Sequence, residues 1–146
     1  MLPLTRNMDR KIKNWTDYAD PRNLALLRAC NIQYKHALSY FKKQKWKEAR
    51  KEYQNFIKMN LIDYDAFYQL GTCCFELGKM EIGNLKKQKH KMSPSKAKEI
   101  REYFDDCIKN LKKAGELEPK NLLLKEELED KKKVIKKLKK KHRGAV

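Results

Sequence analysis

The sequence predicts an all-α fold. Only five glycines and four prolines occur among 146 residues, so the chain has few of the turn signals that a many-stranded β-protein needs. Apolar residues recur at spacings of three and four along most of the chain, which is the periodicity of an amphipathic helix. At this length the chain has room for one domain with one modest core.

Two helices are expected in the first half of the chain. Residues 1–20 show no steady periodicity, and we treat them as an N-terminal arm. Asp20 and Pro21 are typical of an N-cap followed by a proline in the first helical turn. Helical spacing of apolar residues then continues to about Lys43, and after a short connection a second helix is expected over residues 46–59.

Three more helices are expected in the second half. The third covers residues 64–77 and ends at Gly78, because glycine suits a left-handed C-terminal cap. Residues 79–92 are basic and contain a further glycine, so they are expected to form a loop. A fourth helix over 94–117 opens on a serine and a proline, and a fifth runs over 122–141.

The chain is strongly basic. Its 36 lysines and arginines, against 19 aspartates and glutamates, give a net charge of +17 and a pI near 9.7. Such a surface favours anionic partners, which include nucleic acid, acidic protein segments and anionic membranes. Charge alone does not choose among these three.

The cysteines and the apolar segments narrow the class of protein. The four cysteines form no CxxC pair and share no ligand-like spacing with the histidines, so we expect buried thiols and no metal site. No apolar run approaches the ~20 residues that a membrane helix needs, and the first residues lack the apolar centre of a signal peptide. We therefore expect an intracellular protein, with the cytoplasm as its default compartment.

The sequence repeats with a period of 34 residues. Ala37 and Gly71 stand at this offset, and both are small residues that allow two helices to approach closely. Two further pairs share the offset: Tyr40 with Cys74, and Phe41 with Phe75. This period and these residue types resemble the tetratricopeptide repeat (TPR) family. The stretch FYQLGTCCFELGKM over 67–80 resembles the first helix of such a repeat, and DCIKNLKKAGELEPKN over 106–121 resembles the second.

The resemblance implies a TPR-like α–α superhelix, in which antiparallel helix pairs stack on one another. The repeat domain covers residues 21–121, and the second repeat carries an insertion at about 79–105, where the family has only a short connection. Residues 122–146 are expected to form a capping helix, which covers the last apolar face of the stack, and a basic tail. This long basic C-terminal helix exceeds the length of a TPR helix, so its basic end is expected to project beyond the body.

In TPR proteins the first helix of each pair lines a concave groove that holds segments of partner proteins. The resemblance places nine side chains along this groove: Asn31, Tyr34, Lys35, Leu38, Lys42, Tyr68, Gln69, Thr72 and Glu76. Tyr34 and Tyr68 are one repeat apart and are expected to stack along the same wall, since tyrosine offers rigid contact area with a polar tip. The alternative is that both tyrosines pack between helices.

Two basic clusters are candidates for contact with an anionic partner. One belongs to the expected loop and the other to the last helix: Lys86, Lys87, Lys89, Lys91, Lys132, Lys133, Lys136, Lys137, Lys140 and Arg143. The alternative is that both clusters are solvated surface without a ligand. A membrane anchor is not expected, because the apolar stripe of the last helix is narrow and lacks aromatic residues.

These features predict an interaction protein rather than an enzyme. No nucleophile, histidine and carboxylate stand at a catalytic spacing, and neither a phosphate-binding glycine loop nor an HExxH motif occurs. We therefore expect no cofactor and no small-molecule substrate. The expected role is a protein–protein adaptor or scaffold subunit of a larger complex, with another protein in the groove and an anionic surface on the tail. The alternative is an RNA-binding or ribonucleoprotein-associated protein.

Overall fold

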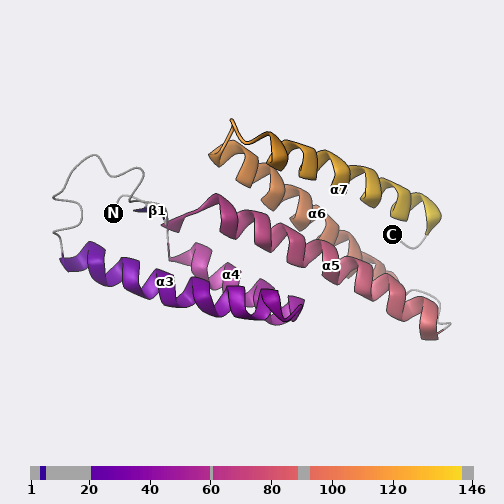
Figure 1. Cartoon of the computed structure of the whole chain (residues 1–146). Coiled ribbons are helices and arrows are strands. Elements are labelled where there is room, and N and C mark those ends of the chain that lie inside the picture. The colour runs from indigo at the N-terminus through magenta and orange to yellow at the C-terminus, as the bar shows by residue number, and fades with distance from the viewer. Residues whose placement is uncertain (1–3, 6–20, 60, 89–92, 143–146) are drawn as a thin grey trace.

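The computed structural model describes residues 4–5, 21–59, 61–88 and 93–142. This part of the chain forms five helices in a row: α3 (Pro21–Lys42), α4 (Trp46–Lys58), α5 (Tyr64–Gln88), α6 (Pro94–Leu117) and α7 (Leu122–Lys141). Successive helices run antiparallel and lie side by side, which gives an elongated stack (Figure 1). The prediction of an all-α fold is confirmed.

One short strand pairing accompanies the helices. β1 (Leu4–Thr5) pairs in parallel with β2 (Leu61–Ile62), which lies between α4 and α5. The sequence predicts only an arm and a helix break at these positions. The backbone amides and carbonyls of the connection lie outside the helices, and pairing with β1 supplies them with hydrogen-bond partners.

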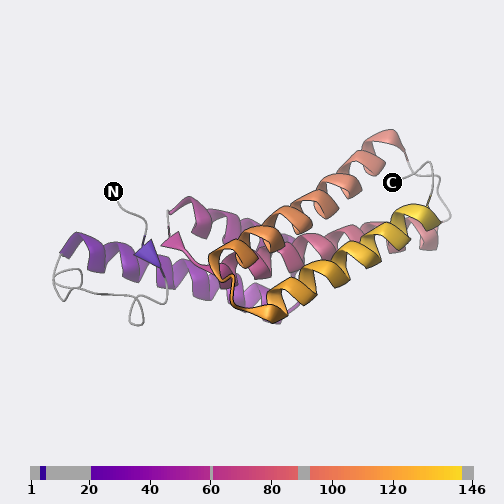
Figure 2. The same cartoon turned by 90° about the horizontal axis from the view of Figure 1, so that it is seen from above.

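The core surrounds α5. Figure 1 shows α5 between the pair α3 and α4 and the pair α6 and α7, and α5 packs against both α4 and α6. Figure 2 shows α4 and α6 on one side of the stack and α3 and α7 on the other. The largest fully buried side chains apart from cysteines come from α4 and α6: Tyr53, Phe56, Ile100, Phe104 and Leu111. The two helices that flank α5 on one side therefore supply the largest completely buried side chains of the core.

The sequence predicts that α5 ends at Gly78, but the helix continues well beyond this residue. Gly78 is buried inside the helix, where a Cβ atom would lie 2.6 Å from Cε1 of Phe104 in α6. Glycine therefore occupies this position because α5 and α6 approach each other too closely for a side chain. Beyond it Ile82 is buried in the core, and this burial favours helix in the basic stretch. The predicted loop is wrong for residues 79–88, and residues 89–92 lie outside the described residues.

Gly71 marks a second close approach between helices. A Cβ atom at this position would lie 3.0 Å from Cγ of Leu111 and 3.2 Å from the carbonyl oxygen of Cys107, both in α6. Ala37, which stands 34 residues earlier, is fully buried. The expectation that both small residues are buried in helix packing is confirmed.

α7 does not project beyond the body. Leu124 and Ile135 are buried against the other helices, and Nζ of Lys139 lies 4.0 Å from Oδ1 of Asp105 in α6. The predicted projection is therefore wrong. Residues 79–88 extend α5, and residues 94–105 form the first half of a long α6. These two long helices give α7 a surface to pack on along most of its length (Figure 1).

Candidate functional site

Tyr34 packs between helices instead of lining a groove. Its side chain is only 7% exposed, and its ring makes an edge-to-face contact with Phe56 of α4, with the ring centroids 5.4 Å apart. Its hydroxyl donates a hydrogen bond to Oε1 of Gln69 in α5 at 3.1 Å. For Tyr34 the structure therefore favours the packing alternative, and we remove this residue from the candidate site.

Gln69 joins three helices. Its Oε1 accepts hydrogen bonds from the hydroxyl groups of Tyr34 in α3 and of Tyr53 in α4. This role differs from the groove contact that the resemblance implies for Gln69. Of the other candidates in α3, Leu38 packs against the core, and three remain exposed: Asn31, Lys35 and Lys42.

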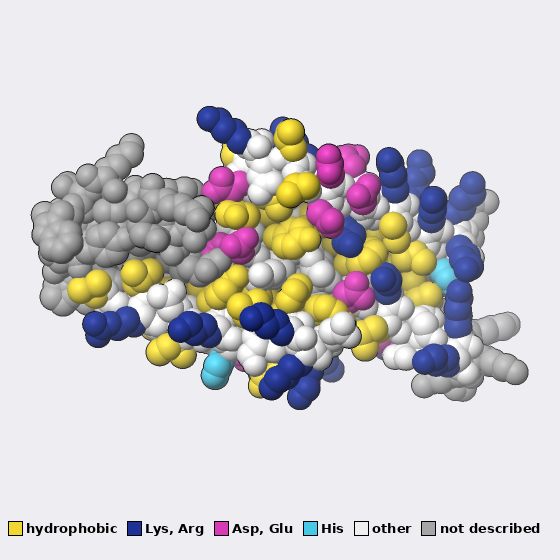
Figure 3. Space-filling model, viewed as in Figure 1, with side chains coloured by type: hydrophobic (Ala, Val, Ile, Leu, Met, Phe, Trp, Pro, Cys, Tyr) yellow, Lys and Arg dark blue, Asp and Glu magenta, His cyan; other side chains and the backbone are white. Residues whose placement is uncertain are grey.

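A groove runs between α5 and α7 on the face seen in Figure 3. It holds a cavity of about 360 Å³, which is lined by Tyr64, Asp65, Tyr68, Asn121, Leu123, Leu124, Glu126, Glu127 and Asp130. Tyr68 is the predicted groove residue that reaches this cavity. Thr72 and Glu76 follow Tyr68 at steps of four, so all three residues lie on the same face of α5. We call this feature the α5–α7 groove.

The residues that α7 contributes to the groove are not predicted from the sequence, where this helix is interpreted as a cap. A signal is nevertheless present, because the helix begins with three consecutive leucines. Two of them, Leu122 and Leu123, are 67% and 70% exposed. Neighbouring exposed leucines beside a cavity are typical of a surface that binds a partner.

The α5–α7 groove is acidic although the protein as a whole is basic. Its lining includes four carboxyl groups: Asp65, Glu126, Glu127 and Asp130. Burial raises the pKa of the Tyr68 hydroxyl, and the charge of Glu127 raises it further. Nζ of Lys131 lies 3.8 Å from Oε2 of Glu127 and offsets part of the negative charge. The groove can therefore accept a segment that carries both apolar and cationic side chains.

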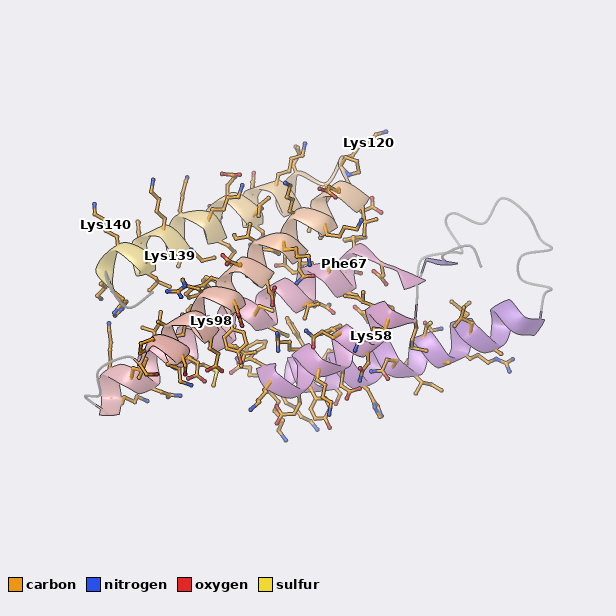
Figure 4. All side chains as sticks on the ribbon, turned by 180° about the vertical axis from the view of Figure 1, so that it is seen from behind. Lys58, Phe67, Lys98, Lys120, Lys139 and Lys140 are labelled. Atoms are coloured by element: carbon orange, nitrogen blue, oxygen red, sulfur yellow. The ribbon has the colours of Figure 1, made fainter. Side chains whose placement is uncertain are left out.

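The two predicted basic clusters meet at one end of the molecule. Lys86, near the end of α5, lies beside Lys141 at the end of α7, and its contact with this second ammonium group lowers the pKa of Lys86. Figure 4 shows Lys98, Lys139 and Lys140 toward this same end. We define the basic end by its exposed lysines in α5 and α7: Lys86, Lys87, Lys136, Lys137, Lys140 and Lys141.

The remaining basic candidates divide into two groups. Lys132 and Lys133 are exposed on α7, one to two turns before the basic end. Lys132 forms an ion pair with Glu129, with Nζ 3.4 Å from Oε1. Three candidates lie outside the described residues: Lys89, Lys91 and Arg143.

Replacing Lys86 with glutamine is expected to raise the pKa of His142 toward its ordinary value of 6.5. In the folded protein that pKa is lowered, first by burial and then by the charges of Lys86 and Lys141, which disfavour the protonated imidazole. Proton NMR titration of the imidazole resonances measures this shift. Lys132→Gln removes the same charge from a more distant part of α7 and serves as the control. An unchanged pKa of His142 in the Lys86→Gln variant would contradict the contact between the ends of α5 and α7.

The cysteine thiols are packing groups. All four are buried and unbridged, as predicted. Burial raises the pKa of Cys74 to about 11 and that of Cys107 to about 12, so these thiols stay protonated near neutral pH. Within residues 21–59, 61–88 and 93–142, no group of three or more histidine, cysteine or acidic side chains is arranged to hold a metal ion.

Comparison with protein-family models, curated proteins and solved structures gives no significant match. In the part of the chain that the structure describes, no helix has both the length and the hydropathy of a membrane span. The class that the fold defines is therefore an all-α protein with an acidic groove between α5 and α7 and a basic end.

Proposed function

We propose that this chain is a TPR-like interaction module, which serves as a non-catalytic adaptor or scaffold subunit. The α5–α7 groove holds a segment of a partner protein, and the basic end contacts an anionic surface of the same assembly. The observation that carries this proposal is the groove itself. It combines a cavity of about 360 Å³ with a tyrosine, exposed leucine and several carboxyl groups, which suits the recognition of a side chain in a partner segment.

The order of the helices supports the TPR-like interpretation. α3 and α4 form one antiparallel pair, α5 and α6 form the next, and α7 stands where a third pair would begin. The 34-residue offset relates Ala37 in α3 to Gly71 in α5, and both are buried. In a stack of this kind the first helices of successive pairs neighbour each other, which is the relation between α5 and α7 at the groove.

The exposed apolar side chains of α7 support a docking role. Leu123 is 70% exposed and Val134 is 40% exposed, and the step of eleven residues between them places both on one face of the helix. Covering this face with a partner would remove apolar surface from water, which is favourable by roughly 25 cal/mol per Å². The carboxyl groups beside Leu123 would select among apolar partners by charge.

Affinity purification from native cells, followed by mass spectrometry, tests the proposed groove. The double variant Tyr68→Ala/Leu123→Ala is expected to reduce recovery of a partner protein tenfold or more, since it removes the aromatic and the apolar contact together. Ile32→Ala is the matched control, because Ile32 is an exposed apolar residue of α3 that does not line the groove cavity. Lys136→Gln/Lys137→Gln/Lys140→Gln is expected to recover this partner protein as the wild type does. It is expected to lose those bound molecules that the wild type retains only at low salt. Equal recovery with the groove variant and the wild type would rule out the groove as the binding site.

A further inference from the structure

A second cavity lies between the start of α5 and the last turns of α6. Its volume is about 410 Å³, and it is lined by Phe67, Lys109, Asn110, Lys112, Lys113 and Glu116. None of these residues lines the α5–α7 groove or belongs to the basic end. The volume falls within the range of about 300–1,000 Å³ that is usual for ligand sites.

Phe67 provides an aromatic surface at this cavity. Its side chain is half-buried, and it stands apart from the main core cluster of the described residues. In the TPR pattern this position carries an aromatic residue for packing, but here part of the ring borders the cavity. An aromatic ring beside a cavity is a platform on which a planar group can stack.

Three lysines surround this platform. Lys109, Lys112 and Lys113 are exposed, and no ion pair among the described residues includes any of them. Elsewhere in the chain lysines of the same helices do have partners; Nζ of Lys96, for example, lies 2.8 Å from Oε2 of Glu81. Three unpaired cations beside one aromatic side chain leave positive charge for a ligand to neutralise.

Two hydrogen-bond acceptors complete the lining. Nδ2 of Asn110 donates to the backbone oxygen of Asp106 at 2.8 Å, which fixes the amide and leaves its Oδ1 as an acceptor. The carboxylate of Glu116 is the second acceptor. Both can receive a hydrogen bond from an exocyclic amino group of a nucleobase, as carboxylates do from cytosine.

We propose that this cavity binds single-stranded nucleic acid. One base stacks on Phe67 and donates its amino group to Asn110 or Glu116, while the neighbouring phosphates contact the three lysines. Figure 4 shows Lys120 above Phe67 and Lys58 below it, so positive charge continues on both sides of the cavity along a strand's path.

Fluorescence anisotropy with labelled oligonucleotides of about twelve nucleotides tests this proposal. The probes are oligocytidine RNA, oligouridine RNA and oligodeoxycytidine. The wild type is expected to bind oligocytidine at least threefold more tightly than oligouridine, since uracil lacks the amino group. Equal affinity for oligocytidine and oligodeoxycytidine would assign the site to single strands of either kind, and preference for the ribo-oligomer would assign it to RNA.

Two variants separate stacking from charge. Lys109→Gln/Lys112→Gln/Lys113→Gln is expected to weaken binding tenfold or more and to reduce the slope of log K against log salt by about 2, at roughly 0.7 for each phosphate that a lysine no longer neutralises. Phe67→Leu is expected to weaken binding about fivefold without changing the slope, because it removes the stacking surface but no charge. Far-ultraviolet circular dichroism melts establish that both variants keep their fold.

Lys132→Gln/Lys136→Gln/Lys140→Gln removes the same charge from α7 and is the matched control; it is expected to weaken binding less than the α6 triple variant. Equal losses from the two triple variants would overturn the proposal, because binding would then follow net charge. Unchanged affinity in Phe67→Leu would overturn it as well. Tighter binding of a competing acidic peptide that contains phenylalanine would reassign the cavity to a protein ligand.

Discussion

Replacing Gly78 with valine is expected to destabilise the protein by about 3 kcal/mol. A Cβ atom at this position would lie 2.6 Å from Cε1 and 2.9 Å from Cζ of Phe104. The Phe104 ring is fully buried and lies against Phe75, with the ring centroids 6.2 Å apart, so it has little room to move away. Urea denaturation followed by circular dichroism measures the change in the free energy of unfolding.

The control for this substitution lies in the same helix. Gly83 has nothing within 4 Å of its Cβ position, so Gly83→Val is expected to change the free energy of unfolding by less than about 0.5 kcal/mol. Comparing the two variants removes the general effect of valine on helix propensity. If Gly78→Val were as stable as Gly83→Val, α5 and α6 could not approach as closely as the structure has them.

Replacing Ile135 with alanine is expected to destabilise the protein by about 3 kcal/mol. Ile135 is 5% exposed and belongs to the core cluster, so its truncation would leave a cavity between α7 and the rest of the protein. A helix that projected into solvent would tolerate this change. The expected fall in Tm is roughly 10 °C for a chain of this size, which differential scanning calorimetry measures.

Val134 is the neighbour of Ile135 in α7 and is 40% exposed. Val134→Ala is therefore expected to shift the free energy of unfolding by no more than about 0.5 kcal/mol. The pair of variants compares the two faces of one helix turn. Similar, small effects from both substitutions would show that α7 is detached from the body in solution.

The helices can be predicted from the sequence because their signals are local. Apolar spacing places the last two helices. A proline after a capping residue marks the start of α6, where Ser93 accepts a hydrogen bond from the backbone N–H of Lys96. The continuation of α5 depends on contacts with α6 and has no local signal. Glycine suits both a helix end and a close helix contact, and only the position of Phe104 distinguishes these roles for Gly78.

The site is only partly predictable for a related reason. Tyr34 and Tyr68 look equivalent in the sequence because they are one repeat apart. In the structure Tyr34 meets Gln69 and the rings of α4, whereas Tyr68 borders the cavity beside α7. Which helix comes next in the stack decides whether a residue at this position is covered. The carboxyl groups of α7 complete the groove, and they become relevant only when that helix is known to lie beside α5.

The distribution of charge along α7 has a consequence for how the protein approaches other molecules. Glu126, Glu127 and Asp130 lie in its first half, and the lysines from 132 onward follow in its second half. The resulting electric moment points along the long axis of the stack. Near a polyanion this moment turns the molecule so that its lysine-rich tip leads and the carboxylate-lined recess faces away. Such an orientation leaves the recess open to a second ligand while the tip is engaged.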